Sequence, residues 1–249
     1  PQDAYKVVAE VSKWNIPDRL RSIWDRRCVK RTVMTIPYNA KPFSNRSYIR
    51  DALLEKGIEL DKDELTLTVN AVREAMQVVV PGPMKVMKWI EDEVKTVLKS
   101  GKKYLRWETP SGFIVHQEIM EYDKKKPKRI ELKLLGGCTL QLGKLTDNPN
   151  VSRHKAATAP NLIHSLDASL LHLATTRFDN PIALIHDSVL CRATDMNILD
   201  ILVRETYMDL FAKRDYLNDF ARQIGAETEP PIEGDLEPET VMKSTYFFC

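Results

Sequence analysis

A proline-rich break between two long helical patterns constrains the fold most strongly. Apolar residues recur at helical spacing over residues 63–79, where Asp63 is a plausible N-cap. The sequence Pro-Gly-Pro at 81–83 interrupts that pattern, and a second helical pattern covers residues 84–99. Each pattern has an apolar stripe, so we expect the two helices to pack on each other as a scaffold.

Before this pair of helices the pattern is helical. After the pair it changes to strand-like and then, apart from one further hairpin, back to helical. Apolar residues that alternate between turn signals, such as those at 110–112, are typical of β-hairpins. The stretch 148–160 is polar and is expected to be a loop. We therefore predict an α+β fold, with helices at 3–14, 18–38, 47–56, 161–178 and 196–220 and strands near 104–107, 113–120, 130–142 and on both sides of 186–188.

The composition is that of a folded protein with a sizeable core. The chain has 249 residues, of which 43% are hydrophobic, enough to form one or two domains. It has no run of apolar residues long enough to span a bilayer, so no membrane partner is expected. The cysteines form no Cys-x-x-Cys pair, so we expect reduced thiols in a cytosolic protein at Cys28, Cys138, Cys191 and Cys249.

Charge is distributed unevenly, although the net charge is only +2. Residues 1–50 contain eleven Lys/Arg against four Asp/Glu, and residues 124–133 contain six Lys/Arg and one Glu. Residues 226–239 carry six acidic residues and no basic residue. Basic patches on a near-neutral chain can bind an anionic partner, but solvated helix faces explain most such patches. Charge alone therefore leaves nucleic-acid binding open.

Four residues spaced four apart suggest a helix that binds phosphate. Arg26, Lys30, Met34 and Tyr38 form a slowly turning stripe on the helix expected at 18–38. A guanidinium offers paired donors for phosphate oxygens, and an ammonium adds a point charge that can also give up a proton. The phenol would then lie near the sugar and base of a bound nucleotide. An amphipathic surface helix explains the same spacing equally well.

The triplet His186-Asp187-Ser188 lies between two short apolar runs, at the expected tip of a hairpin. A carboxylate there is exposed on a rigid support, where a divalent cation can reach it. An ordinary turn explains the triplet as well, because Asp and Ser favour turns.

Together these stretches resemble motifs B and C of the phage-type single-subunit RNA polymerases, a family of phage and mitochondrial enzymes. R-x-x-x-K-R-x-x-M-x-x-x-Y at 26–38 resembles motif B, and the hairpin HDS resembles motif C. DNA polymerases of the same superfamily share the R-x-x-x-K pattern but usually carry HDE. Other stretches resemble the family in the same order, namely WETPSGFIVHQ at 107–117, the promoter-reading hairpin RIELKLLGGCTLQL at 129–142, APNLIHSLDASLL at 159–171 and the aromatic carboxyl-terminal foot YFFC.

The resemblance implies a right-hand polymerase architecture. Residues 1–160 would form the fingers, mostly helical, with the motif B helix at about 18–39 and the promoter-reading hairpin at about 128–143. Residues 161–249 would form the C-terminal part of the palm, with the motif C hairpin and the aromatic foot. The implied reaction is template-directed nucleotidyl transfer from NTPs by a two-metal mechanism, in which positioning and electrostatics dominate.

The resemblance also implies roles in catalysis. Asp187 would bind the two Mg²⁺ ions, with His186 beside it as structural support. Arg26 and Lys30 would hold the triphosphate of the incoming nucleotide, and Lys30 would donate a proton to the leaving pyrophosphate. Tyr38 would close the site and favour a 2′-hydroxyl over deoxyribose.

Further residues match nucleic-acid contacts of the family. His164 would contact the minor groove of the nascent hybrid, and Phe43 would meet the downstream template. The implied partners are the DNA template and promoter, nascent RNA and NTPs. The implied location is the cytoplasm of an infected bacterium, with a mitochondrion or another organelle as second choice. The positions that would read promoter bases are Arg129, Glu131, Thr139 and Gln141.

The chain departs from the family pattern near motif B and in the hairpin. Tyr38 is followed by Asn39, where the family usually has Gly, and Asn tolerates the left-handed conformation better than most residues. Pro37 removes a backbone donor, so we expect a bent or tighter helix end, and either Pro37 or Asn39 could alter sugar selection. Glu131 and Thr139 differ from the residues expected in the hairpin, and an acid in the major groove favours a cytosine amino group. These changes suggest a different promoter, or none.

The chain contains no segment that resembles motif A, which supplies the second metal-binding Asp in the family. Asp167 could replace it, but we assign Asp167 to capping or orienting its own helix. A single carboxylate is a poor site for two Mg²⁺ ions. We therefore predict that the isolated chain is inactive and that an N-terminal polymerase portion or second subunit supplies the missing Asp. A non-catalytic DNA-binding remnant and a DNA polymerase subunit are the alternatives.

Overall fold

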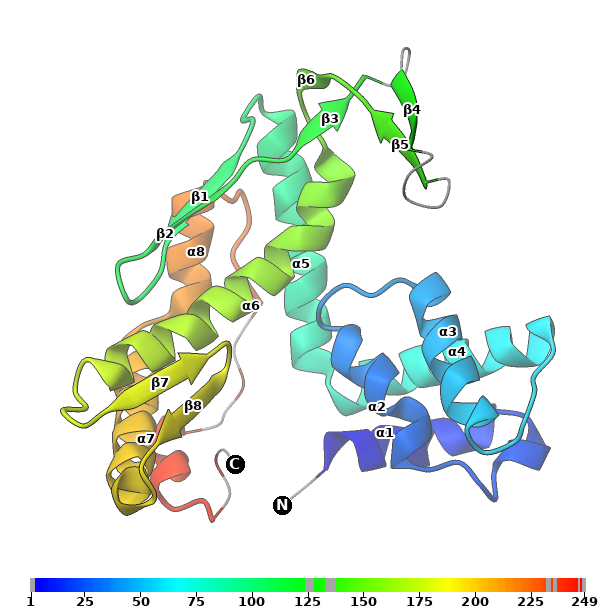
Figure 1. The fold of residues 1–249 in the computed structure, drawn as a ribbon, viewed down its shortest axis with the longest axis horizontal. Coiled ribbons are helices and arrows are strands. Elements are labelled where there is room, and N and C mark those ends of the chain that lie inside the picture. Colours follow the sequence, from blue (N-terminus) through cyan, green and yellow to red (C-terminus); the bar gives the residue numbers. More distant parts are fainter. Residues whose placement is uncertain are drawn as a thin grey trace.

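The computed structural model describes residues 3–123, 128–132, 138–231, 234, 237–245 and 247, and it describes only the backbone of 128–132 and 138–142. The fold is α+β, as predicted (Figure 1). Its long helices are α1 (Ala4–Ser12), α2 (Arg26–Thr35), α3 (Pro42–Leu54), α4 (Lys62–Val79), α5 (Pro81–Lys99), α6 (Val151–Thr175), α7 (Met196–Lys213) and α8 (Tyr216–Ile224). Its strands are β1 (Leu105–Glu108), β2 (Ile114–Gln117), β3 (Met120–Tyr122), β4 (Lys128–Leu132), β5 (Cys138–Leu142), β6 (Leu145–Pro149), β7 (Ile182–Ile185) and β8 (Ser188–Cys191).

The strands form four antiparallel pairs: β1 with β2, β3 with β6, β4 with β5, and β7 with β8. The predicted hairpins are therefore present, including the one at 128–143. Helices α1–α4 lie at one end of the molecule and α7 with β7 and β8 at the other, with α5 and α6 packed together between them (Figure 1). No helix in the described parts of the chain is long and apolar enough to cross a membrane.

Helices α4 and α5 contribute to different cores, which corrects the prediction that their apolar faces pack mainly on each other. The buried residues of α4 pack with those of α1, α2 and α3, whereas those of α5 pack with β1, α6 and α8. Pro81 occupies the first turn of α5 directly after Val80, so α5 starts before residue 84. Proline is tolerated there because the first turn needs no amide donor.

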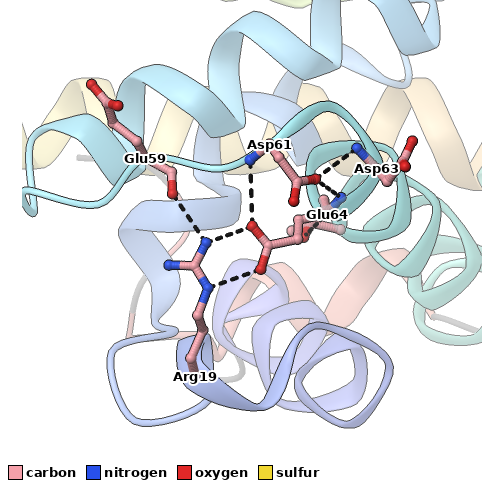
Figure 2. Close-up of polar contacts among 6 residues, drawn as sticks. Arg19, Glu59, Asp61, Asp63 and Glu64 are labelled. Atoms are coloured by element: carbon pink, nitrogen blue, oxygen red, sulfur yellow. Dashed lines mark hydrogen bonds and ion pairs between the residues drawn. The ribbon is translucent and has the colours of Figure 1, made fainter.

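Helix α4 is capped two residues earlier than predicted. The Asp61 carboxylate accepts hydrogen bonds from the amides of Asp63 (2.9 Å) and Glu64 (2.8 Å), so Asp61 is the N-cap and Asp63 lies in the first turn. The Glu64 carboxylate lies 3.4 Å from the Asp61 amide, which completes a capping box, and also accepts from Arg19 Nε at 2.8 Å (Figure 2). This network ties the segment before α2 to α4.

Three other predicted boundaries are wrong for a common reason, namely caps that the apolar pattern does not reveal. The Asp25 side chain caps α2, so the helix expected at 18–38 is a 3₁₀ turn at Asp18–Leu20 followed by the shorter α2. The Asn150 side chain accepts from the Arg153 amide at 3.0 Å, so α6 covers most of the expected loop at 148–160. The Asp215 side chain caps α8, which separates it from α7.

His154 anchors the early part of α6, and its burial predicts that stability depends on pH. Its side chain is fully buried, its Nε2 accepts from the Ile119 amide at 3.1 Å, and its Nδ1 lies 3.0 Å from the Gln117 amide nitrogen. Burial lowers the pKa of His154 below its ordinary 6.5. The unfolded chain therefore takes up a proton near pH 6.5 that the folded chain resists.

We expect the free energy of unfolding to fall as pH drops below about 6.5, by at most about 1.4 kcal/mol per pH unit for one proton. Urea denaturation at pH 7.5 and pH 5.5 measures this loss. The same comparison in His154→Gln should show a smaller loss, because glutamine does not titrate. An equal loss in both proteins would assign the pH dependence to other groups.

Candidate functional site

The basic residues of α2 are exposed because the opposite face of the helix is buried. Cys28, Val29 and Val33 belong to the core, whereas Arg26 and Lys30 are exposed. The helical spacing thus presents the predicted phosphate ligands to solvent.

Arg26 is already paired within the chain. Its Nε lies 2.5 Å from Asp3 Oδ2, and its Cζ lies 5.0 Å from the centre of the Tyr5 ring. Arg26 is the first residue of α2, where the helix dipole disfavours a cation, and the Asp3 carboxylate offsets that cost. The hydrogen bond from Arg26 also lowers the pKa of Asp3. The guanidinium is therefore held in place from α1.

Tyr38 lies in a turn after α2 and not on the helix itself. Pro37 lacks an amide donor, and the Tyr38 amide donates to the Thr35 carbonyl at 3.1 Å, three residues back. The tighter helix end predicted from Pro37 is confirmed. Asn39 has φ 63°, in the left-handed region predicted for it, and the Ala40 amide closes the turn on Thr35 at 3.0 Å.

The Tyr38 ring stacks on the ring of His164 from α6. Their centroids are 4.8 Å apart and their planes differ by 25°. Both side chains are exposed on their outer sides. The structure thus brings together two predicted site residues that are far apart in the sequence.

Asp187 lies at the tip of the β7–β8 hairpin, as predicted. The register pairs Ile185 with Ser188, so His186 and Asp187 form the turn, and His186 adopts φ 56°. The Asp187 side chain is exposed, where a cation can reach it.

Asp187 also lies beside the exposed face of α6 that carries His164. Asp167 lies inside α6, whose caps are Asn150 and Thr176, so the prediction that Asp167 caps its helix is wrong. Asp167, one helical turn after His164, shares with Asp187 a cavity of about 500 Å³. Burial raises the pKa of Asp167, the Asp187 charge raises it further, and His164 opposes the shift. Tyr38, His164, Asp167 and Asp187 therefore form a row along one side of α6, which we call the α6 row.

The α6 row fits part of a Mg²⁺ site. Asp187 offers an accessible carboxylate, the oxygen ligand that Mg²⁺ prefers, and Asp167 places a second carboxylate at the same cavity. The described residues contain no cluster of three or more His, Cys, Asp or Glu that could hold a metal ion. Within the described part of the chain, neither Arg26 nor Lys30 makes a hydrogen bond or ion pair with Asp187. The described residues could supply some of the ligands but do not form a closed metal centre.

The remaining predicted residues lie outside the α6 row. Phe43 follows the first residue of α3 and is 81% exposed, which leaves its ring available for contact. The backbone of the β4–β5 hairpin pairs Arg129 with Gln141 and Glu131 with Thr139. The side chains of these four residues lie outside what the structure describes.

Two features of the site were missed by the sequence analysis. Phe247, near the carboxyl end, lines the cavity that holds Asp187, and its ring centroid is 5.1 Å from that of Tyr207. Asn39 is hydrogen-bonded to Glu91 of α5 and to the Lys155 carbonyl of α6. The aromatic foot and the Asn in place of Gly were visible signals, but their partners depend on tertiary packing.

Comparisons with known proteins identify relatives along most of the chain. The family model for DNA-dependent RNA polymerase matches residues 1–230. The DNA-directed RNA polymerase of Pseudomonas phage phiKMV is 30% identical over 244 residues, which cover 91% of this chain and 29% of the relative. DNA-directed RNA polymerase 2, chloroplastic/mitochondrial, of Arabidopsis thaliana is 30% identical over 240 residues, covering 90% of this chain and 23% of the relative.

A second phage protein matches this chain with a similar identity and coverage. The DNA-directed RNA polymerase of Enterobacteria phage T3 is 30% identical over 261 residues, covering 90% of this chain and 29% of the relative. The chain thus spans less than a third of the length of each of these relatives.

Proposed function

The chain belongs to the family of DNA-dependent RNA polymerases, and we propose that it forms the carboxyl-terminal catalytic portion of such an enzyme. In this proposal residues 1–160 are the fingers and residues 161–249 are part of the palm. The α6 row supports the proposal, because it joins the turn after α2 to the tip of the β7–β8 hairpin. A polymerase needs its nucleotide-binding residues and its metal-binding carboxylate to face one site.

The proposed roles follow from the chemistry of the exposed groups. Arg26 and Lys30 hold the triphosphate, and Lys30 gives a proton to the leaving pyrophosphate. Asp187 holds Mg²⁺, with His186 supporting the turn, and Tyr38 contacts the sugar. When bound, the two ions activate the RNA 3′-hydroxyl and neutralise charge on the leaving group. An upstream polymerase portion supplies the second Asp that the two-metal mechanism requires.

Nucleic-acid contacts complete the proposal. His164 contacts the nascent hybrid, and Phe43 contacts the downstream template. The hairpin of β4 and β5 reads promoter DNA through the residues at 129, 131, 139 and 141. Because two of the relatives are phage proteins, we place the activity in the cytoplasm of an infected bacterium.

Transcription of a defined DNA template tests the proposed function. The reaction contains Mg²⁺ and NTPs, with the chain alone or together with the upstream polymerase portion that carries motif A. We expect template-length RNA only from the mixture, because the sequence of this chain contains no segment that resembles motif A. A mixture of two folded parts that binds DNA but makes no RNA would instead indicate a non-catalytic DNA-binding protein. Preference for dNTPs would indicate a DNA polymerase subunit.

A further inference from the structure

We propose that Asn39 is a positioning residue that fixes the Tyr38 ring against His164 and thereby strengthens selection of the nucleotide sugar. The effect on sugar selection rests on the proposed function. The placement of the Tyr38 ring does not, and it can be measured on the chain itself.

Every polar group of the Asn39 side chain has a partner. The Nδ2 group donates to Glu91 Oε1 at 2.8 Å and to the Lys155 carbonyl at 3.2 Å, and Oδ1 accepts from Lys41 Nζ. An amide has two donor hydrogens and one oxygen, so these contacts satisfy it. We call this set of contacts around Asn39 the Asn39 clamp.

The centre of the clamp is a half-buried carboxylate that lies between two lysine ammonium groups. Glu91 Oε1 lies 3.3 Å from Lys41 Nζ, and Glu91 Oε2 lies 3.4 Å from Lys155 Nζ. Burial raises the pKa of Glu91, but the Asn39 hydrogen bond and the two lysine charges outweigh burial, so the net shift is downward. Glu91 therefore stays ionised and keeps its bond to Asn39.

The Asn39 clamp joins the turn that carries Tyr38 to two helices, and a neighbouring hydrogen bond joins the same turn to a third. Asn39 reaches α5 through Glu91 and α6 through the Lys155 carbonyl. On the other side, Arg73 of α4 donates to the Ala40 carbonyl at 3.1 Å. Since His164 is also on α6, the clamp fixes Tyr38 relative to the helix on which its ring stacks.

A glycine at position 39 would give a different turn. Glycine adopts positive φ easily, but it has no side chain that could make hydrogen bonds to α5 and α6. Its backbone can therefore also adopt other conformations. Asn39 accepts an uncommon φ of 63° and compensates with side-chain contacts. Asn39 therefore restricts the backbone next to Tyr38 and keeps the Tyr38 ring in one position.

The test combines ring contacts in the chain with sugar preference in the assembled polymerase. The chain has five histidines, so a His164→Gln variant is needed to identify the His164 signal in NMR spectra of histidine-labelled protein. In the original protein the stacked Tyr38 ring changes the chemical shift of that signal. We expect Asn39→Gly to move the His164 signal toward that of a Tyr38→Ala variant. We also expect about a fivefold to tenfold fall in the preference for NTPs over dNTPs, comparable to the loss of one hydrogen bond.

A paired exchange of carboxylate and amide distinguishes positioning from a general loss of stability. Asn39→Asp places a second carboxylate against Glu91 and should release Tyr38. Asn39→Asp combined with Glu91→Gln restores the hydrogen bond between positions 39 and 91 but not the one to the Lys155 carbonyl, so it should recover part of both readouts. Asp61→Ala, which removes the distant cap of α4, is the control for lost stability and should change neither readout.

The outcomes are distinct. An unchanged His164 signal in Asn39→Gly would overturn the positioning role whether or not the assembled protein makes RNA. A moved signal with unchanged sugar preference would overturn the role in selection. Absence of RNA synthesis by the original assembly would refute the proposed function, and the His164 signal would still decide the positioning role.

Discussion

Asp187→Asn is expected to reduce RNA synthesis by the assembled polymerase on the order of 10³-fold or more, since a metal ion contributes several kcal/mol of charge stabilisation. Asparagine has nearly the same size and shape but carries no charge, so it is a poor ligand for Mg²⁺. Asp187 is exposed at a hairpin tip, and its replacement removes no buried contact. The loss should therefore appear in catalysis and not in folding.

The measurement is template-directed RNA synthesis by the assembled polymerase over a range of Mg²⁺ concentrations. Asp179→Asn is a matched control, because Asp179 is also an exposed aspartate and lies just after α6. Its activity should equal that of the original protein. DNA binding by Asp187→Asn should stay the same and remain salt-dependent, because the basic patches are unchanged. Activity of Asp187→Asn within tenfold of the control would remove Asp187 from the metal site.

The sequence predicted the elements that carry the site better than the contacts between them. The four-residue spacing of Arg26 and Lys30 was sufficient to place both on one exposed helix face, because helical geometry is local. The alternation of apolar residues around Asp187 was sufficient to predict a hairpin tip. Each of these predictions depends on a short stretch of chain.

The contacts that make the site depend on residues distant in sequence. Neither the stacking of Tyr38 on His164 nor the pairing of Arg26 with Asp3 has a local signal. The early start of α6 was missed because its first turns are polar, yet a buried His154 holds them against β2 and the chain after it. The polar appearance of that segment reflects a buried hydrogen-bond network and not a loop.

Trp107→Ala is expected to lower the free energy of unfolding by about 3–5 kcal/mol, the usual cost of emptying a large aromatic site in a core. Trp107 is 2% exposed, on the inward face of β1. Its ring meets Phe220 of α8 edge-on, with centroids 5.4 Å apart, and its Nε1 donates to Ser165 Oγ of α6 at 3.2 Å. One side chain thus connects β1, α8 and α6.

Trp14→Ala provides the matched control, because Trp14 is 70% exposed and its ring contacts the Arg21 guanidinium at the surface. The same substitution there should cost less than about 1 kcal/mol. Urea denaturation of the three proteins, followed by circular dichroism, measures both losses. Ser165 is adjacent to His164, so the Trp107 variant should also loosen the stacking of Tyr38 even before it unfolds. Equal losses in the two variants would show that Trp107 does not hold α6 in place, and the α6 row would then need another support.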